Sequence, residues 1–371
     1  RSYGRYSVYV QDRLSLADDR LYVEPGMRLD HYGLIGSSHL APRLRVHVVL
    51  TPTTTLRAAW GRYTQSPGYE KLMMSRDRLQ LTEETDLRPL QAERATHYTA
   101  SLTHRESGSY RLEAAAYWKT MRRLITPRWA SVSEPQARYT GDAPRTDPAG
   151  YVLESGAALQ QTPELTNEGR GHAYGVELTV RRLQQAHRRL SGWISYAFAR
   201  SVRSHRHTPS IEVQRPFAYD RRHTLNATGN LRVGARWTMG ATLRFGTGFP
   251  HTTPTGLTPI VVDANGEAAR ILTHNTTGNV RFKPDFGRPE RRYAARLPAY
   301  YRLDLRLART VDWSAVSGRF YIDIINATNR TNVLSYQYAA VTDPDKVRPV
   351  VYQQAIYMMP LVPSVGFQLR F

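Results

Sequence analysis

Few residues of this sequence stand at spacings that support catalysis or metal binding. His205 and His207 flank Arg206 in a polar stretch, and two imidazoles this close are suited to a metal or haem site. The stretch offers no third ligand, however, and a pair without one is more typical of a solvated loop. The sequence contains no His-Glu-x-x-His motif, no Walker loop and no Gly-x-Ser-x-Gly motif. We therefore expect no catalytic residues, no resident metal and no cofactor.

The composition narrows the class of protein further. The chain has 371 residues and no cysteine, which excludes disulfide scaffolds, thiolate metal sites and thiol nucleophiles. Its hydrophobic content of 41% is too high for a disordered polyelectrolyte. No run approaches the ~18 consecutive apolar residues of a transmembrane helix. The sequence begins at Arg1 without a secretory signal, so we expect it to be part of a longer product.

The positive charge is carried almost entirely by arginine. The net charge is +20, and lysine occurs only at positions 71, 119, 283 and 346. Nucleic-acid-binding proteins usually mix both residue types and cluster them on one face, whereas these arginines are spread along the whole chain. We attribute the excess to a compositional preference for arginine and expect no nucleic-acid partner.

Apolar and polar residues alternate with period two through most of the chain, which predicts β-strands. In residues 301–309, for example, Leu303, Leu305 and Leu307 share one face, and Arg302, Asp304 and Arg306 share the other. Many runs exceed the ~5–6 residues of ordinary strands and approach the ~9–11 that a tilted strand needs to cross a bilayer. We predict about thirteen strands, centred on residues 5–16, 20–31, 41–51, 54–64, 94–105, 109–122, 172–183, 189–201, 220–233, 236–246, 299–310, 318–328 and 360–371.

The connections between these strands alternate between short and long. Short turns are predicted at residues 17–20, 51–54, 106–109, 184–188, 234–235 and 311–317. Longer solvated loops are predicted over about nine residues after His31 and at residues 65–93, 124–171, 202–219, 248–298 and 329–359. This alternation is typical of an antiparallel transmembrane β-barrel with short periplasmic turns and long extracellular loops. The alternative is a large soluble all-β protein.

The two faces of the predicted strands have the chemistry of a barrel wall. Leu, Val and Phe form the face that would meet lipid, and the other face would line a wet lumen. The 23 tyrosines often stand near strand ends, as aromatic girdles require. Opposite charges stand close together on the polar face, namely Arg28 and Asp30, Arg111 and Glu113, Arg302 and Asp304, and Arg319 and Asp323.

In the C-terminal part of the sequence, a strand YYRLDLRLAR is followed by a short turn and by FYIDIINATNRTNV. This order resembles the end of TonB-dependent outer-membrane receptors, and the second segment is similar to the family's Asn-rich phrase, with Ala327 and Thr328 in place of its Leu-Phe pair. PLVPSVGFQLRF resembles the family's last strand, in which Phe371 matches the final aromatic residue that the outer-membrane assembly machinery reads. Upstream strands such as YSVYVQDRLSLADDRLYVEPGMRLDHY and GHAYGVELTVRR resemble the barrel of the same family.

The resemblance covers nearly the whole chain and implies a specific architecture. Family barrels have about twenty-two strands behind an N-terminal plug. Residues 1–371 would then be a partial barrel domain that lacks the plug and about the first nine strands. The resemblance also implies the outer membrane of a Gram-negative bacterium, a surrounding lipid bilayer, the assembly machinery, and a TonB energy-transducing complex that acts through the plug.

The implied function is energised import of a scarce ligand, such as an iron chelate, a vitamin or a glycan. The sequence leaves two alternatives open, a passive porin or barrel adhesin, and a barrel enzyme whose catalytic residues meet only in space. An arginine-rich lumen would guide an anionic cargo through charge-assisted contacts. The candidate ligand-binding residues are Arg203, His205, Arg206 and His207 in an outer loop, and Arg244 in the lumen.

Overall fold

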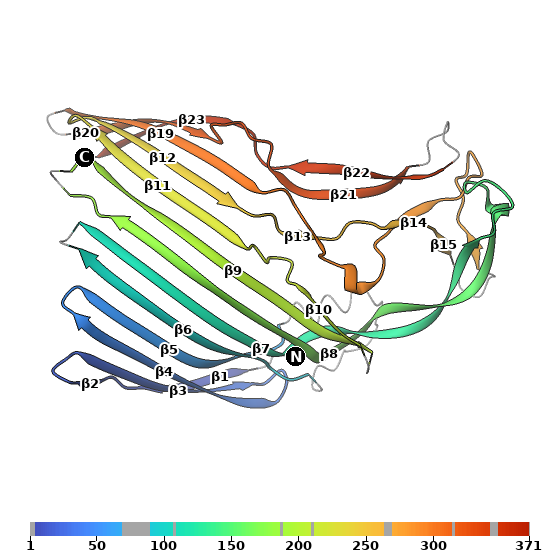
Figure 1. The fold of residues 1–371 in the computed structure, drawn as a ribbon, viewed down its shortest axis with the longest axis horizontal. Coiled ribbons are helices and arrows are strands. Elements are labelled where there is room, and N and C mark those ends of the chain that lie inside the picture. The colour runs from blue at the N-terminus through green and yellow to red at the C-terminus, as the bar shows by residue number, and fades with distance from the viewer. Residues whose placement is uncertain are drawn as a thin grey trace.

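One broad antiparallel sheet dominates the computed structural model of this chain (Figure 1), and smaller hairpins extend from one end of it. The structure describes residues 4–68, 90–106, 109–185, 188–208, 211–262, 269–313, 316–341 and 348–370. None of these residues belongs to a helix long and apolar enough to cross a membrane. The strands along the main path of the sheet are β1 (Arg5–Gln11), β3 (Leu21–Tyr32), β4 (Ser37–Thr51), β5 (Thr54–Gln65), β6 (Glu93–Glu106), β7 (Tyr110–Tyr139), β8 (Tyr151–Arg182), β9 (Leu190–Thr208), β11 (His223–Val233), β12 (Trp237–Gly246), β19 (Tyr300–Trp313), β20 (Val316–Ile325) and β23 (Val362–Arg370).

These strands confirm the predicted ones in the predicted order, except that the strand predicted over residues 5–16 is interrupted at Asp12 and Arg13. Two short strands join the path from the side, since β2 (Leu14–Leu16) pairs with β3 and β10 (Ile211–Pro216) pairs with β9. All pairings are antiparallel. Strands β1 and β23 are the two edges of the sheet, and within the described ranges they do not pair with each other.

The short turns gather at one end of the sheet, at the left of Figure 1, and the long connections gather at the other. At the short end, Ala17, Asp18 and Asp19 all adopt positive φ and close the tight turn before β3. The predicted link of about nine residues after His31 is wrong. Four residues separate β3 from β4, because the β3–β4 ladder continues outward as far as the pair Tyr32 and Ser37.

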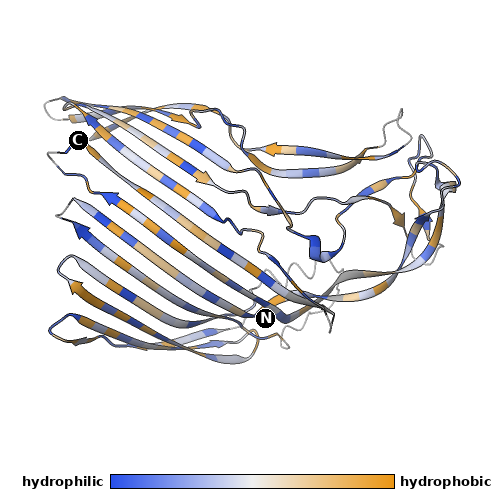
Figure 2. Cartoon of the chain, in the orientation of Figure 1, coloured by the Kyte–Doolittle hydropathy of each residue, from blue (hydrophilic) through white to orange (hydrophobic). Residues whose placement is uncertain are grey.

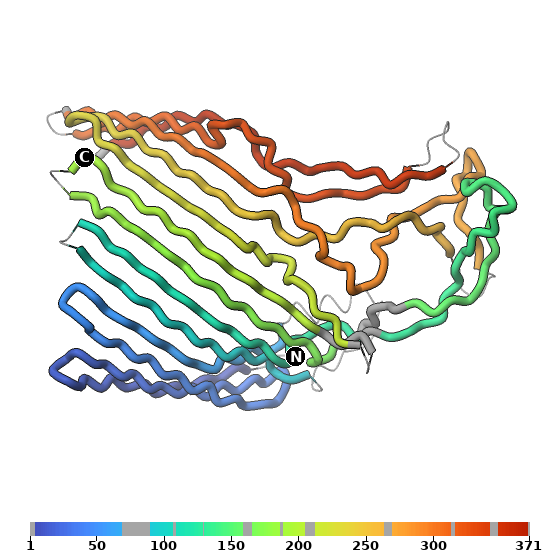
Figure 3. Tube along the Cα trace, viewed as in Figure 1, coloured from blue at the N-terminus to red at the C-terminus, as the bar shows by residue number. Residues whose placement is uncertain are grey.

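Several of the predicted solvated loops contain regular β-structure instead. Strands β7 and β8 run on through residues 124–171 as a hairpin that ends at the pair Tyr139 and Tyr151, and Figure 3 shows this green hairpin projecting beyond the sheet. Beyond a membrane neither face of a hairpin meets lipid, so backbone pairing persists while the alternation that revealed the other strands is lost. The remaining outer elements are β13 (Pro250–His251), β14 (Gly256–Pro259), β15 (Val261–Val262), β16 (Arg270–Ile271), β17 (Phe282–Asp285), β18 (Ala295–Arg296), β21 (Val333–Val341), β22 (Val350–Tyr357) and the 3₁₀ turns η1 (Pro148–Gly150) and η2 (Pro289–Arg291).

One face of the main sheet is apolar from one edge to the other. Cross-strand partners on this face are apolar on both sides, as for Leu56 with Leu102 and Leu307 with Ile322, and Figure 2 shows the resulting alternation along each strand. These side chains are exposed rather than packed against a second layer; Val365, for example, is 80% exposed. An apolar sheet face of this extent without a packing partner is the arrangement of a wall that contacts lipid.

The opposite face is polar and holds ion pairs. Arg28 lies 2.9 Å from Asp30, Arg302 lies 2.7 Å from Asp304, and Arg111 lies 3.7 Å from Glu113, so three of the predicted pairs are confirmed. The fourth is wrong, because Asp323 pairs with Arg306 of β19 rather than with Arg319 of its own strand. The reason is geometric: residues four apart on one strand lie ~13 Å apart, whereas Arg306 stands directly opposite Asp323 across the ladder.

The asparagines of the Asn-rich phrase join the last strands of the sheet. Asn326 is fully buried with φ of 54°, and its side-chain amide donates to the carbonyls of Arg330 and Met359. Asn332 exchanges two hydrogen bonds with the backbone of Tyr301 in β19. Asn329 accepts from the N–H of Leu361, just before β23. The motif is therefore a backbone clasp that fixes the turn after β20 between β19 and β23.

Candidate functional site

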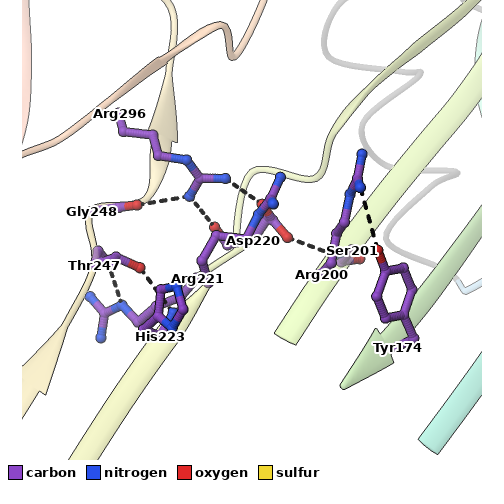
Figure 4. A network of polar contacts seen from close by, with 10 residues as sticks. Tyr174, Arg200, Ser201, Asp220, Arg221, His223, Thr247, Gly248 and Arg296 are labelled. Atoms are coloured by element: carbon purple, nitrogen blue, oxygen red, sulfur yellow. Dashed lines mark hydrogen bonds and ion pairs between the residues drawn. The ribbon is translucent and has the colours of Figure 1, made fainter. Parts of the chain in front are cut away.

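A buried carboxylate organises the long-connection end of the sheet between β9 and β12. Asp220 lies in the turn between β10 and β11 and is 2% exposed. Its carboxylate accepts from the backbone N–H of Ser201 at 2.6 Å, from Arg222 at 2.8 Å and from Arg296 at 2.5 Å. Arg296 also donates to the carbonyls of Asp220 and Gly248 (Figure 4). One side chain thus ties β9, the turn before β11 and the connection between β12 and β19 together.

These contacts hold the carboxylate in its charged form. Burial by itself would raise the pKa of Asp220, but the hydrogen bonds from Arg222, Ser201 and Arg296 outweigh this effect and lower the pKa below its usual value. Asp220 therefore forms ion pairs with Arg222 and Arg296 at neutral pH. Because removal of one partner would leave a buried charge, the network is a rigid anchor for the connection that follows β12.

The turn between β10 and β11, which contains Asp220, also positions aromatic side chains near the outer connections. Arg221 donates to the carbonyl of Thr247 at 3.0 Å, and its guanidinium lies 4.1 Å from the ring centre of Phe249. Gly248 allows this course of the chain, because a Cβ there would lie 1.6 Å from the carbonyl oxygen of Leu297. Phe249 in turn meets Tyr219 edge to face at 6.1 Å. The close backbone contact at Gly248 and the stacking of Arg221 on Phe249 therefore fix the position of Phe249 against Tyr219.

An aromatic cleft of about 460 Å³ lies beside this anchor. His251 packs on Tyr336 at 5.4 Å, and Phe286 meets Tyr338 edge to face at 6.1 Å. The Nδ1 atom of His251 and the hydroxyl of Tyr338 are buried, and among the described residues they have no hydrogen-bond partner. The cleft is lined by Ala218, Tyr219, Phe249, Pro250, His251, Thr252, Phe286, Tyr293, Leu297, Leu334, Ser335, Tyr336 and Tyr338. It therefore combines flat apolar surfaces with polar atoms that are free to bind a ligand.

Both polar groups are neutral at physiological pH. Burial lowers the pKa of His251, which favours the uncharged imidazole. Burial, followed by the effect of Tyr336, raises the pKa of Tyr338 and keeps its hydroxyl protonated. The cleft itself is thus an uncharged aromatic surface, and any charge selectivity must come from its neighbours.

A smaller cleft of about 190 Å³ supplies that charge. Arg203 of β9 stands directly opposite Arg215 of β10, and both line this cleft. The guanidinium of Arg203 lies 4.0 Å from the ring centre of Phe217, and its Nε is buried without a hydrogen-bond partner in the described part of the chain. Ala218 and Tyr293 line both clefts, so the arginine pair and the aromatic surface form one continuous site, which we call the rim site.

The predicted site residues are divided by the structure. Arg203 lines the smaller cleft of the rim site. Arg244 lies outside the rim site. Across the ladders of β12, β11 and β9 it is level with Ser195, which is eight residues or ~26 Å from Arg203 along β9. Arg244 instead pairs with Asp304 at 3.3 Å. The backbone of β9 includes His205, Arg206 and His207, but their side chains lie outside the described set, as does Phe371.

The sequence prediction missed Asp220, Arg296 and the aromatic residues of the cleft. The phrase FAYDRRH was a usable signal, since it places two aromatic residues and three charges between two alternating runs. Nothing in the sequence pairs Asp220 with a residue 76 positions later. In the described ranges no group of three His, Asp or Glu side chains is arranged to hold a metal ion.

Comparisons with known proteins agree with the antiparallel β-barrel architecture of this chain. The sequence matches the family model described as TonB dependent receptor-like, beta-barrel, over residues 1–327. No curated protein matches the chain. Among solved structures, the outer membrane transporter YddB from Escherichia coli superposes with a TM-score of 0.59 at 14% identity, covering 98% of this chain and 44% of its own.

Two further structures have the same fold. The ferric enterobactin receptor PfeA from Pseudomonas aeruginosa has a TM-score of 0.53 at 16% identity, covering 88% of this chain and 40% of its own. The ferric citrate transporter FecA has a TM-score of 0.54 at 12% identity, covering 99% of this chain and 45% of its own. The chain thus spans less than half the length of each of these proteins, and at such identities the likeness establishes the fold alone.

Proposed function

The chain belongs to the TonB-dependent receptor-like β-barrel family. On that premise we propose that it forms part of the barrel wall and the ligand-binding rim of an outer-membrane receptor, which takes up a scarce ligand by an energised mechanism. The apolar face of the sheet would contact the lipid bilayer, and the polar face would line the lumen. Energy would come from the TonB complex through a plug, and Phe371 would serve the outer-membrane assembly machinery. These partners follow from the family resemblance.

The rim site carries the proposal for the cargo. Its aromatic cleft offers stacking surfaces beside two polar atoms, and Arg203 offers a buried guanidinium Nε. None of these three atoms has a hydrogen-bond partner among the described residues. Aromatic surfaces bind flat rings, and desolvated arginines bind anionic oxygens through strong charge-assisted hydrogen bonds. Of iron chelates, vitamins and glycans, this combination favours an anionic metal chelate with aromatic rings.

Binding by the intact receptor tests this cargo class. The receptor that carries this chain would be purified from outer membranes, and its affinity measured for an anionic aromatic ferric chelate, a neutral ferric chelate, cobalamin and a maltooligosaccharide. We expect the anionic aromatic chelate to bind most tightly. Arg203→Gln should weaken that binding about tenfold, or ~1.4 kcal/mol. The control is Arg319→Gln, which removes an arginine from the same polar face of the sheet but near the short turns, and it should leave the binding unchanged. Tightest binding of a neutral ligand would contradict the assignment.

Uptake in cells tests the energised mechanism against the porin and adhesin alternatives. Uptake of a labelled ligand should stop when TonB is deleted or when a protonophore removes the proton gradient. Uptake that continues without TonB would indicate a passive porin, and surface binding without any uptake would indicate an adhesin.

A further inference from the structure

An aromatic row crosses the apolar face of the sheet near its long-connection end. Trp60 of β5 stands opposite Tyr98 of β6, Tyr98 opposite Trp118 of β7, and Trp118 opposite Tyr174 of β8. Trp118 and Tyr174 stack at 5.2 Å, and Tyr98 and Trp118 are 50% and 46% exposed. A row of exposed Trp and Tyr at this position marks the boundary between hydrocarbon and headgroups.

Arginines follow directly beyond this row, on the same face. Arg62 stands two residues beyond Trp60, and Arg94 and Arg122 stand four residues beyond Tyr98 and Trp118, so period-two alternation gives all three the outward direction of the aromatic row. All three are exposed. Their side chains lie ~7–13 Å along the strands from the aromatic residues, at the level of lipid headgroups.

The backbone register brings these arginines together, and no acidic side chain of the described residues balances their charge. Arg94 and Arg122 are direct cross-strand partners, and like charges in that position destabilise a sheet. The positive charges of Arg123 and Arg62 also act on Arg94. In the part of the chain that the structure describes, no ion pair joins Arg62, Arg94 or Arg122 to an acidic side chain. Such repulsion favours the binding of an anion between these arginines.

A cleft of about 790 Å³ opens at this cluster. Pairing between β4 and β5 begins only at Arg43 and Gly61, because Pro42 has no N–H to donate to a second neighbour; the outer ends of the two strands therefore separate. The described residues that line the cleft include four arginines and six side chains with a hydroxyl group but no Asp or Glu, namely Ser38, His39, Leu40, Trp60, Arg62, Tyr63, Thr64, Arg94, Ala95, Thr96, Tyr98, Trp118, Thr120, Arg122 and Arg123.

We propose that this cleft binds the phosphorylated headgroup of an outer-leaflet lipid, whose acyl chains lie along the apolar face below the aromatic row. Arg62, Arg94 and Arg122 would hold phosphate oxygens, and the threonine hydroxyls would donate further hydrogen bonds. The inference rests on the proposed outer-membrane location but not on the proposed cargo. It assigns a function to a face of the barrel that takes no part in transport.

The position of the arginines favours a lipid over a soluble anion. On the same face towards the short turns, β5 to β8 carry Leu56, Leu102, Leu112 and Leu178, and a single arginine, Arg182, stands against Tyr110 at the end of β8. A general preference for arginine therefore does not account for a group of three that begins where the aromatic row ends. A soluble anion would need no apolar wall beside its site. A lipid uses both surfaces at once, since its headgroup meets the arginines and its chains meet the leucines.

Native mass spectrometry of the receptor purified from outer membranes in detergent tests the inference, with bisphosphorylated lipid A as the probe. The double variant Arg94→Gln/Arg122→Gln should weaken lipid A binding at least tenfold. The matched control is Arg105→Gln/Arg111→Gln, which removes another directly opposed arginine pair from the same two strands, on the polar face and near the short turns. Its lipid A binding should equal that of the unmodified receptor.

Thermal stability gives a second readout that does not depend on mass spectrometry. Added lipid A should raise the melting temperature of the unmodified receptor and of the control, but not that of the Arg94/Arg122 variant. Equal binding by all three proteins, or equal loss in both variants, would overturn the inference. Displacement of lipid A by millimolar inorganic phosphate would also overturn it, in favour of a soluble anion. A receptor missing from the outer-membrane fraction would instead refute the proposed location.

Discussion

The carboxylate of Asp220 and the guanidinium of Arg296 are joined by an ion pair of 2.5 Å although 76 residues separate them in the sequence. Arg296 reaches Asp220 from the far end of the connection between β12 and β19, and it also binds the carbonyl of Gly248 at the near end. The pair therefore closes a long connection at its base. The aromatic cleft lies on the segments that this closure brings together.

Asp220→Asn should loosen the rim without unfolding the barrel. The change removes the charge that holds Arg222 and Arg296, at a cost of ~1.5–3 kcal/mol for hydrogen bonds to charged groups. We expect faster proteolysis within residues 248–298 and weaker ligand binding, with unchanged heat-modifiability on detergent gels. Asp323→Asn removes a comparable ion pair from the barrel wall and should leave proteolysis of the rim unchanged. Equal protease sensitivity of the two variants would contradict an anchoring role for Asp220.

The contribution of this pair should disappear in acid. The pKa of Asp220 is lower in the folded state than in the unfolded chain, so its stabilisation is fully present above the unfolded value of about 3.9 and is lost as pH falls through the folded value. The difference in melting temperature between the unmodified receptor and Asp220→Asn should therefore be constant from pH 7 to about 5 and shrink below about 4. A difference that persists undiminished at pH 2 would show that the charge is not responsible.

Asn326→Ala should impair assembly of the last strands more than Asn326→Gly. Both variants lose the side-chain bonds to Arg330 and Met359, but only alanine also has to adopt the positive φ of this position, which adds ~1 kcal/mol of strain. The amount of heat-modifiable receptor in outer membranes should fall in the order Asn, Gly, Ala. An alanine variant that assembles as well as the glycine variant would exclude a conformational role for this residue.

Cysteine labelling should distinguish the two faces of β19, because the chain has no cysteine of its own. In assembled receptor, Arg306→Cys should react with a small water-soluble thiol reagent, and Leu305→Cys and Leu307→Cys should not. A charge in place of Leu305 near mid-membrane should cost roughly 2–4 kcal/mol. Labelling at the leucine positions alone, or equally on both faces, would refute a transmembrane role for this strand.

Asp304 is a poor choice for the same experiment. Its carboxylate binds Arg302 and Arg244 and accepts the backbone N–H of Asn326. Replacement would therefore disturb the clasp after β20 as well as the wall. Arg306 binds Asp323 across the ladder, and its guanidinium lies 4.7 Å from the ring centre of Tyr321. Neither contact involves the turn after β20, so loss of the Arg306 charge should be tolerated by a hydrated surface.

The sequence by itself determined the wall of this protein. A strand between lipid and a wet lumen must alternate apolar and polar residues, so all thirteen strands on the main path, their order and the identity of the two faces were readable from residues such as Leu303, Leu305 and Leu307. The short turns at residues 17–20, 51–54 and 234–235 were readable for the same reason, because each marks a break in the alternation; the turns predicted at 106–109, 184–188 and 311–317 lie partly outside the described residues. The ion pair of Arg302 with Asp304 is also local, since both residues share one face of one strand.

Only the tertiary structure decided what lies beyond the membrane boundary. The β7–β8 hairpin and the outer strands have no lipid-facing side, so backbone hydrogen bonds form them without an alternating pattern. The rim site depends on residues from distant connections, as Asp220 and Arg296 show, and the arginine cluster depends on the register that sets Arg94 opposite Arg122. Period-two alternation gives the face of each residue on its own strand, but cross-strand register and loop closure are set by contacts between distant segments.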